Sequence, residues 1–231
     1  MDPRQRLIVA LDVPTAAAAR KIVAAVGDSA HAYKVGMQLY TAEGPSIVRE
    51  LVDSGHRVFL DLKYHDIPTT VGAAVREAAQ LGVSMLTVHA SGGGKMLRAA
   101  VDAAQAANPD LLVLAVTVLT SLNDDDLGKI GLRGGVLDQV LRLAALALSN
   151  GCKGVVASAQ EAAALREEFG HDFAIVTPGV RLAGTGTHDQ ARVVTPAEAI
   201  AAGASHVVVG RPITEASDPA AEVRAILGQI G

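Results

Sequence analysis

The chain alternates between two kinds of hydrophobic pattern. Short runs rich in Val, Ile and Leu are typical of strands buried on both faces, and each is followed by an Ala-rich stretch with helical spacing. Strands are predicted at Leu7–Val13, Ala32–Gly36, Arg57–Tyr64, Met85–Ala90, Leu111–Thr120, Gly154–Ser158, Ala174–Val180 and His206–Arg211. Helices are predicted at about 15–26, 43–54, 68–82, 94–107, 135–150, 159–169, 195–203 and 217–229. Eight strands alternating with helices predict a parallel sheet closed into a (β/α)8 TIM barrel.

An open, doubly wound sheet is the alternative arrangement of the same elements. Such a sheet usually has fewer strands and carries a Gly-x-Gly-x-x-Gly turn after the first one, where this chain has Asp12-Val13-Pro14-Thr15. No linker rich in Pro, Gly or Ser and no shift in composition divides the sequence. We therefore expect residues 1–231 to form a single barrel domain.

Composition limits the partners and the compartment. Half of the residues are hydrophobic, but aromatic residues make up only 3%, so Ala, Val, Leu and Ile must build the core. A net charge of -4 with scattered basic residues argues against a nucleic-acid surface. Cys152 is the only cysteine, which excludes an intramolecular disulfide. The sequence shows neither a signal peptide nor a span long and apolar enough for a membrane, so we expect a cytoplasmic protein.

Polar residues gather at the predicted carboxyl ends of the strands, where a barrel of this type has its active site. Taken alone, each of these residues can be explained as a helix cap or as a charged residue at the rim of the barrel. The convergence of so many on one mouth, with no comparable set at the opposite ends, predicts a catalytic site. These residues are Asp12, Lys34, Asp61, Lys63, Asp66, His89, Thr117, Thr120, Arg181 and Arg211.

The most informative segment is Asp61-Leu62-Lys63-Tyr64-His65-Asp66-Ile67-Pro68. Side chains alternate between the faces of a strand, so Asp61 and Lys63 are predicted to share one face. Unpaired charge is costly at the end of a buried strand, so these residues need partners. The pattern fits a proton donor held beside negative charge, and it also fits a structural salt bridge.

Two segments near the end of the chain suggest that the site binds an anion. Val209-Gly210-Arg211-Pro212-Ile213 ends the last strand, where such barrels often bind phosphate. The segment 182–190 is rich in small residues and fits either a mobile lid or a disordered loop. Residues 92–96 lack the first glycine and the final Ser or Thr of a P-loop, and the seven histidines lack zinc-ligand spacing. No metal site is predicted, and the aspartates at 124–126 are better explained by a helix N-terminus.

These motifs, in this order, resemble the orotidine 5'-phosphate decarboxylase family of the bacterial type. The resemblance runs from about Leu7 to Leu227, and its most specific part is Asp61-x-Lys63-x-x-Asp66-Ile67-Pro68 followed by Thr70. Tyr64 and Thr69 replace the more usual Phe and Asn, and neither carries a charge. The other matching segments are Leu7–Asp12, Tyr33–Gly36, Thr117–Ser121, Thr177–Arg181, Asp189-Gln190 and Val209–Ile213.

The resemblance implies that orotidine 5'-monophosphate loses carbon dioxide from C6 and gains a proton there, giving UMP in de novo pyrimidine biosynthesis. The family uses no metal or organic cofactor, so electrostatics must stabilise the carbanion. By this resemblance Lys63 stabilises the carbanion and protonates C6, and Asp61 lies beside the substrate carboxylate. Lys34 joins the charged array and contacts the ribose, as does Asp12, and Thr120 contacts the pyrimidine.

The resemblance also implies a homodimer whose two active sites are shared between the chains. Asp66 is expected to reach the partner's site, which Thr70 and the region of Ile67 also line. The residues implied to bind the phosphate as a loop closes are Arg181, Gln190, Gly210 and Arg211.

Two other functions remain open at this point. A magnesium-dependent sugar-phosphate decarboxylase or aldolase can share the Asp-x-Lys-x-x-Asp core on the same scaffold. The Pro178–Arg181 motif together with Gln190 favours the orotidine enzyme. A catalytically silent phosphate-binding barrel is the third reading, and the intact Lys63 and its two carboxylates speak against it.

Overall fold

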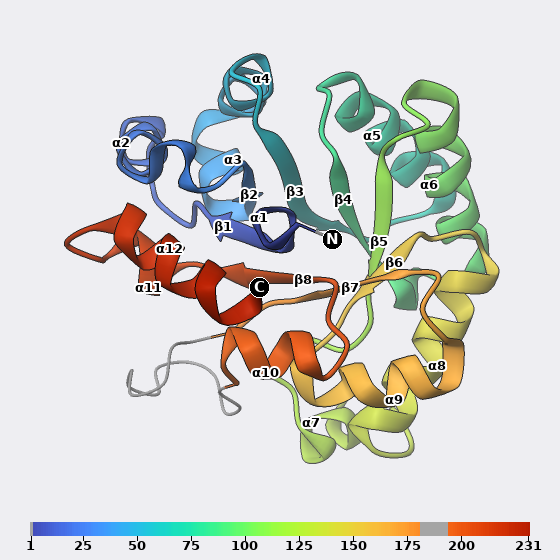
Figure 1. The fold of residues 1–231 in the computed structure, drawn as a ribbon. Helices are drawn as coiled ribbons and strands as arrows, with labels where there is room; N and C mark the ends of the chain where they lie inside the picture. Colours follow the sequence, from blue (N-terminus) through green and yellow to red (C-terminus); the bar gives the residue numbers. More distant parts are fainter. Residues whose placement is uncertain (1, 181–193) are drawn as a thin grey trace.

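Eight parallel strands close into a barrel in the computed structural model, which describes residues 2–180 and 194–231 (Figure 1). Each strand pairs with the next one in the sequence, and β8 pairs with β1 to complete the ring. The predicted (β/α)8 TIM barrel is therefore confirmed. The strands are β1 Leu7–Ala10, β2 Ala32–Gly36, β3 Arg57–Tyr64, β4 Met85–His89, β5 Leu112–Val116, β6 Gly154–Val156, β7 Ala174–Thr177 and β8 His206–Val209.

Helices follow the strands and surround the barrel (Figure 1). None of the described helices is both long enough and apolar enough to cross a membrane. The helices are α1 Pro3–Arg6, α2 Ala16–Val26, α3 Met37–Glu43, α4 Ser46–Asp53, α5 Pro68–Gln80, α6 Gly94–Ala107, α7 Asp124–Lys129, α8 Val136–Ser149, α9 Ala159–Phe169, α10 Pro196–Ala201, α11 Arg211–Thr214 and α12 Pro219–Ile230.

The helix predicted at 43–54 is α4, and a separate helix, α3, precedes it. α3 ends at Glu43, Gly44 adopts a left-handed φ of 65°, and Pro45 precedes α4. Glycine tolerates that conformation and proline has no N–H with which to continue a helix, so the pair breaks the periodic stretch. The predicted helix therefore begins about three residues late, and no helix range was predicted for α1, α3, α7 or α11.

Six of the strands end earlier than predicted, β4, β6, β7 and β8 by one to three residues. β1 ends at Ala10 and β5 ends at Val116, although runs to Val13 and Thr120 were predicted. The neighbouring strand β6 has only three residues, and its last residue, Val156, pairs with Val116. The chain beyond Val116 therefore has no ladder to continue, and it turns toward the mouth of the barrel.

The core forms two apolar layers built mainly from aliphatic residues. The larger layer lies between the strands and the helices, as the low aromatic content led us to expect. The smaller layer comes from the strands alone and fills the inside of the barrel. Its buried members are Ile8, Ala10, Ala32, Phe59, Met85, Leu114, Val176 and Val208.

Arg166 of α9 lies at the floor of the barrel, which is formed by the amino ends of the strands, and it makes several hydrogen bonds there. Its guanidinium donates to the carbonyl oxygens of Gly203, Gly170 and Phe173 at 3.0, 3.2 and 2.9 Å, and to Ser205 Oγ at 2.9 Å. The same group lies 4.6 Å from the centre of the Phe173 ring. Arg166 thereby connects the end of α9 to the segments that lead into β7 and β8.

His206 also lies on the floor, as the first residue of β8. Its side chain is buried, and Nδ1 has no hydrogen-bond partner among the described residues. Burial, with the nearby positive charges of Arg57 and Arg6, lowers the pKa of His206 to about 4. The imidazole is therefore neutral at physiological pH.

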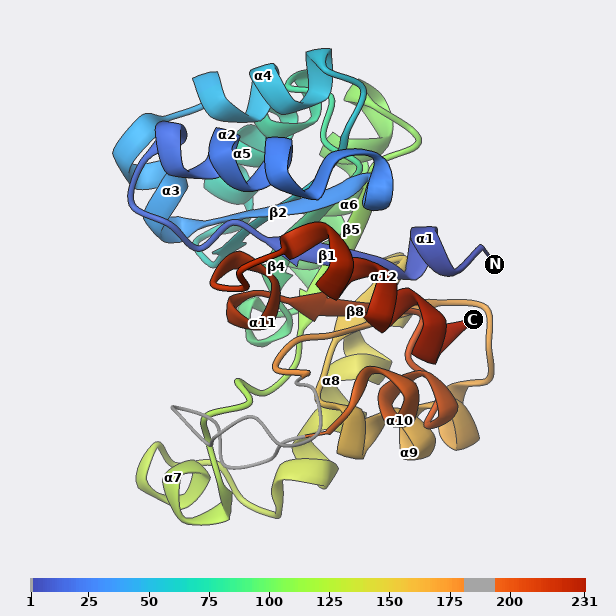
Figure 2. The same cartoon turned by 60° about the vertical axis from the view of Figure 1, so that its left-hand side comes forward.

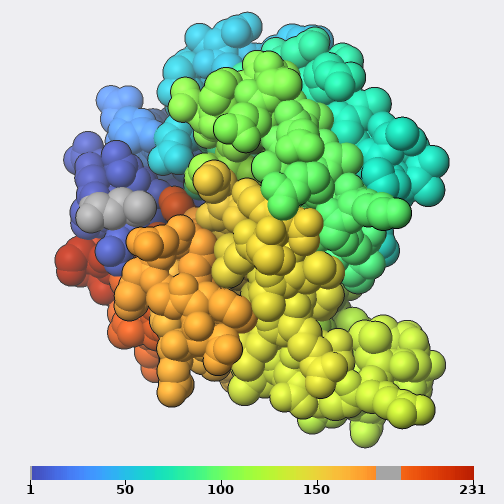
Figure 3. Space-filling view, turned by 90° about the vertical axis from the view of Figure 1, so that its right-hand side faces the viewer, coloured from blue at the N-terminus to red at the C-terminus, as the bar shows by residue number. Residues whose placement is uncertain are grey.

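The segment around α7 stands away from the barrel. Figure 2 shows it separated from the strands, and Figure 3 shows the same region as a yellow-green lobe. Asn123 begins the helix with a capping box, and Asp124 Oδ1 accepts a hydrogen bond from the N–H of Val136 at 2.7 Å. The aspartates at 124–126 form the first turn of α7, so the prediction of a helix N-terminus is confirmed.

Candidate active site

A cavity of about 640 Å³ opens at the carboxyl ends of the strands, on the side of the barrel opposite the floor. Its walls bring together segments far apart in the sequence, from the ends of β1, β2, β3, β7 and β8. The residues that line it are Ala10, Asp12, Val13, Lys34, Gly36, Met37, Gln38, Asp61, Lys63, Pro178, Gly179, Val180, Val208, Gly210, Arg211, Pro212, Thr214 and Glu215.

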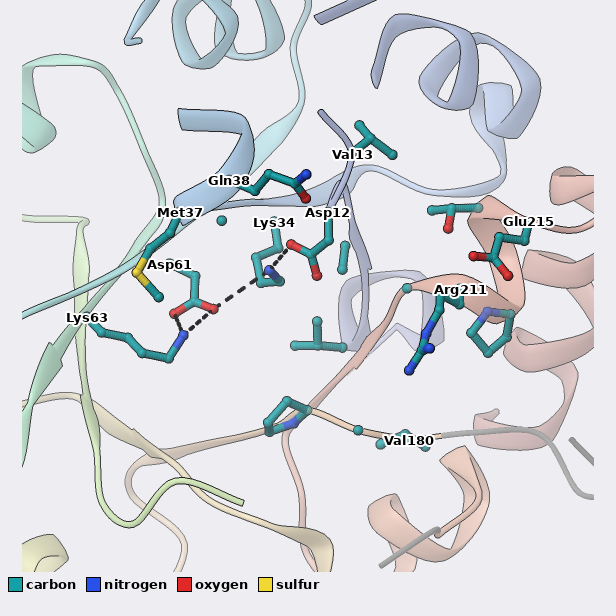
Figure 4. Close-up of a pocket in the computed structure, with 18 residues that line it drawn as sticks. Asp12, Val13, Lys34, Met37, Gln38, Asp61, Lys63, Val180, Arg211 and Glu215 are labelled. Carbon is teal, nitrogen blue, oxygen red and sulfur yellow. Dashed lines mark hydrogen bonds and ion pairs between the residues drawn. The ribbon is translucent and has the colours of Figure 1, made fainter. Parts of the chain in front are cut away.

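Four charged side chains cross one wall of this cavity in alternating sign (Figure 4). Lys63 Nζ lies 2.8 and 2.9 Å from the two carboxylate oxygens of Asp61. Lys34 Nζ lies 3.7 Å from Asp61 Oδ2 and donates to Asp12 Oδ1 at 2.6 Å. Asp61 is therefore held between two ammonium groups, and Lys34 is held between two carboxylates.

Burial strengthens the inner part of this array. The side chains of Lys34 and Asp61 are only 10% and 14% exposed, whereas that of Asp12 is 56% exposed. Opposite charges attract more strongly in such a site than in water. An ammonium group has three N–H donors, and Asp61 takes at most two of those on Lys63. At least one N–H of Lys63 is left for an atom of a substrate.

A bulge in β3 brings Lys63 to this position. Leu60 pairs with Leu86 and Tyr64 pairs with Val88, so three residues of β3 lie opposite one residue of β4. Among the described residues other than glycine, Lys63 alone has a positive φ, of 52°. That conformation costs roughly 1–3 kcal/mol, and strain of this kind clusters at functional sites. Asp61 and Lys63 do meet, as predicted, although regular strand alternation is not what brings them together.

Two residues that support this array were missed by the sequence analysis. Gly36 ends β2, and a Cβ atom there would lie 2.8 Å from Asp12 Oδ1 and 2.9 Å from Lys34 Nζ. Thr87 of β4 donates a hydrogen bond to Asp61 Oδ1 and accepts one from the backbone N–H of Lys63, both at 2.9 Å. Gly36 lies in the matching segment Tyr33–Gly36, but its role, like that of Thr87, depends on contacts with neighbouring strands, which the local sequence does not show.

A smaller, mostly apolar chamber of about 170 Å³ adjoins the charged array. Thr120, predicted to contact the pyrimidine, lines this chamber together with Lys34, Asp61 and Lys63. Its remaining walls are the apolar residues Phe59, Val116, Val118, Leu119, Val156, Val176, Pro178 and Val208.

Arg211 and Gly210 line the large cavity, as predicted for residues that bind an anion. Figure 4 shows Arg211 across the cavity from Lys63, with Asp12 and Lys34 between them. The other two predicted phosphate ligands, Arg181 and Gln190, lie outside the described residues, as does the segment 182–190. The cavity therefore has a charged array at one end and an arginine at the other.

Asp66, Ile67 and Thr70 lie just beyond β3, at the start of α5, and they are exposed. Asp66 Oδ1 accepts a hydrogen bond from the N–H of Ile67 at 2.6 Å, and Ile67 is 63% exposed. None of the three lines either the large cavity or the apolar chamber of its own chain. The structure thus separates these three predicted site residues from the others.

The remaining polar residues at the mouth have local partners. Thr117 donates to the carbonyl oxygen of Val156 at 3.1 Å. The rings of His65 and His89 lie 5.4 Å apart, and the pKa of His89 is lowered by burial first and then by His65 and Lys63. No group of three or more His, Cys, Asp or Glu side chains that could hold a metal ion occurs within residues 2–180 and 194–231.

Comparisons with known proteins agree with the geometry of this site. A family model described as "Orotidine 5'-phosphate decarboxylase / HUMPS family" matches residues 5–226. An orotidine 5'-phosphate decarboxylase of Halorhodospira halophila is 53% identical, over 97% of this chain and 95% of the relative. One from Hydrogenovibrio crunogenus is 48% identical, over 100% of this chain and 98% of the relative.

A solved structure gives the same result. The crystal structure of orotidine 5'-phosphate decarboxylase from Lactobacillus acidophilus matches with a TM-score of 0.89 and 40% identity. The match covers 98% of this chain and 99% of that one. Because the family model spans nearly the whole sequence and these relatives match end to end, this chain belongs to the orotidine 5'-phosphate decarboxylase / HUMPS family.

Proposed function

We propose that this chain decarboxylates orotidine 5'-monophosphate to UMP, in a single domain of residues 1–231. The observation that carries the proposal is the buried array in which Asp61 lies 3.7 Å from Lys34 and 2.8 Å from Lys63, inside a cavity that also contains Arg211. Membership of the family supports the same activity. The substrate has a carboxylate at one end and a phosphate at the other, which suits a cavity with cations at both ends.

Lys63 supplies the main chemical effect. When the bond between C6 and the carboxylate breaks, carbon dioxide leaves and the electron pair remains on C6. A cation fixed beside C6 stabilises this charge without any reorganisation of solvent. One proton then passes from Lys63 Nζ to C6, and Lys63 regains a proton from water. We expect the reaction to require no metal and no organic cofactor.

Asp61 orients Lys63 and lies beside the departing carboxylate. Repulsion between the two carboxylates disappears when the substrate group becomes neutral carbon dioxide. The adjoining apolar chamber suits a neutral product better than it suits an anion. Stabilisation of the carbanion by Lys63 is the larger contribution, because it acts on charge that develops only in the transition state.

The rest of the substrate is bound along the cavity. Lys34 and Asp12 contact the ribose, Thr120 contacts the pyrimidine, and Arg211 with Gly210 binds the phosphate. Arg181 and Gln190 are further phosphate ligands in this proposal. Binding energy from the remote phosphate raises the rate when it is used to order the charged groups around C6.

The exposed position of Asp66, Ile67 and Thr70 supports a homodimer with shared active sites. In this arrangement Asp66 of each chain completes the charged array of the partner, next to Lys63, and Ile67 and Thr70 line the partner's cavity. The arrangement accounts for three family-motif residues that do not line the cavity of their own chain. We expect this dimer to work in the cytoplasm, without nucleic-acid or membrane partners.

Ultraviolet absorbance tests the proposed activity directly. Purified protein should deplete the absorbance of orotidine 5'-monophosphate at the same rate with and without EDTA. Activity that disappears in EDTA and returns with magnesium would instead support a sugar-phosphate decarboxylase or aldolase. A folded protein with no activity toward either kind of substrate, but with affinity for UMP, would indicate a silent phosphate-binding barrel.

A further inference from the structure

Thr87 of β4 supports the strained segment of β3. Three residues, Asp61, Leu62 and Lys63, span the part of β3 that lies between the pairs Leu60–Leu86 and Tyr64–Val88. Thr87 is the one residue of β4 opposite them. The backbone N–H of Lys63 donates to Thr87 Oγ1 at 2.9 Å, so the threonine side chain provides the hydrogen bond that the distorted ladder does not.

The hydroxyl of Thr87 has a fixed orientation. It has one proton to donate, and Asp61 Oδ1, 2.9 Å away, is a carboxylate oxygen that can only accept. A lone pair of Thr87 Oγ1 accepts the hydrogen bond from the backbone N–H of Lys63. One hydroxyl therefore holds the backbone of Lys63 directly and its ammonium group indirectly, through Asp61.

Thr87 is 0% exposed and lines neither the large cavity nor the apolar chamber. It therefore acts on other side chains and not on a substrate. Its neighbours along the strand, Leu86 and Val88, are apolar and equally buried. A hydroxyl in such a place is unfavourable unless it is hydrogen-bonded, and its two bonds lead to Asp61 and Lys63.

We infer that Thr87 is a positioning residue, which sets the location of the Lys63 ammonium group relative to Asp61. This inference rests on the proposed decarboxylase function for its kinetic consequence. Thr87→Val keeps the shape of the side chain and removes the hydroxyl. We expect kcat to fall about 10- to 100-fold, because small displacements of reacting groups have effects of that size, while KM changes less than about threefold. Thr87→Ser retains the hydroxyl and should restore kcat to within about threefold of the wild type.

Thr177 provides a matched control. It is another buried threonine on a barrel strand, 1% exposed, and its Oγ1 has no hydrogen-bond partner among the described residues. Thr177→Val should leave both kcat and KM close to the wild-type values. The inference is overturned if Thr87→Val and Thr177→Val have equal effects, if Thr87→Ser fails to restore kcat, or if the loss lies in KM.

Crystal structures of the wild type and of Thr87→Val separate this inference from the proposed function. The variant should show a changed φ at Lys63 or a lengthened contact between Lys63 and Asp61. Unchanged geometry overturns the positioning role, whatever reaction the protein catalyses. If the wild type does not decarboxylate orotidine 5'-monophosphate, the proposed function fails, and the two structures still decide whether Thr87 positions Lys63.

Discussion

Lys63 combines a left-handed backbone with an ammonium group that contacts Asp61 at 2.8 Å. Because its strained conformation serves the position of its side chain, we expect Lys63→Ala to fold normally and to lose nearly all turnover. The loss should exceed the roughly 10²–10⁴-fold that is typical of acid–base catalysis, since charge stabilisation is lost as well. Steady-state kinetics together with circular dichroism measure both properties.

Lys21→Ala is a suitable control for Lys63→Ala. Lys21 is an exposed lysine of α2 and does not line the cavity, so its removal should leave turnover unchanged. A folded Lys63→Ala enzyme that works within about tenfold of the wild type would be inconsistent with a role as proton donor, whose typical effect is larger.

His206 makes the stability of the protein dependent on pH. Its pKa is about 4 in the folded state, below the ordinary value near 6.5. As the pH falls through about 6.5, His206 becomes protonated in the unfolded chain but stays neutral in the folded chain. The free energy of unfolding therefore declines until the pH reaches about 4, where the folded chain is protonated as well. Between pH 7.5 and pH 5 this group should lower the free energy of unfolding by about 2 kcal/mol.

Urea unfolding of the wild type and of His206→Gln measures that contribution. From pH 7.5 to pH 5 the free energy of unfolding should fall by about 2 kcal/mol more in the wild type than in the variant. The titrating carboxylates are common to both proteins and so do not contribute to this difference. Parallel losses in the two proteins would assign the pH dependence to other groups.

At the scale of single residues, the sequence predicted charges better than it predicted their supports. Asp61, Lys63, Lys34, Asp12 and Arg211 were found from the strand-end pattern and from the family motif, because charged residues at the end of an apolar strand are conspicuous. Thr87 and Gly36 were missed because their contacts cross to other strands. The sequence alone does not show that the hydroxyl of a buried threonine, or the absence of a Cβ atom at a glycine, supports charged residues on another strand.

Gly36, at the junction between β2 and α3, tests how two elements are coupled. Its φ of −95° is open to any residue, so alanine introduces no backbone strain there. The new Cβ would lie within 2.9 Å of both Asp12 Oδ1 and Lys34 Nζ, and one of these groups must move. We expect Gly36→Ala to lower kcat/KM about 10- to 100-fold, with a melting temperature close to that of the wild type.

Gly128→Ala on α7 is the matched control. A Cβ at Gly128 meets no atom within 4 Å, and alanine favours the helix by up to about 1 kcal/mol. It should keep full activity and melt slightly higher than the wild type. If Gly36→Ala is as active as Gly128→Ala, the contact between Lys34 and Asp12 is not needed for turnover.

At the scale of elements, the sequence predicted the order of strands and helices but not all of their limits. β2 and β3 have the predicted bounds, and they pair with each other along the whole of β2. β1 and β5 stop early, since a strand also needs a neighbour with which to pair, and neighbours are not visible in a local pattern. The bulge in β3 was not predicted for the same reason, as it exists only relative to β4.

The whole molecule is expected to be a dimer, which subunit exchange can test. Lys63→Ala and Asp66→Ala homodimers should each be nearly inactive. In a mixed dimer one shared site collects both defects and the other collects neither. Random exchange of equal amounts makes about half of the dimers mixed, so about a quarter of all sites become wild type. Activity should rise toward that fraction as subunits exchange.

Mass spectrometry of differently labelled subunits verifies that exchange has taken place. If exchange is complete and activity does not rise, then Asp66 serves the site of its own chain. A protein that stays monomeric at all concentrations in analytical ultracentrifugation would contradict the shared site outright.

The hydrogen bonds of Arg166 on the floor of the barrel have a practical consequence for engineering. Gly210, which lines the cavity at the mouth, lies four residues after His206 on the floor, a distance of roughly 13 Å at the rise of a strand. Substitutions that far apart usually add without interacting. Variants with greater heat tolerance can therefore be sought around Arg166, Gly203 and Ser205, while substrate preference is evolved separately at the mouth.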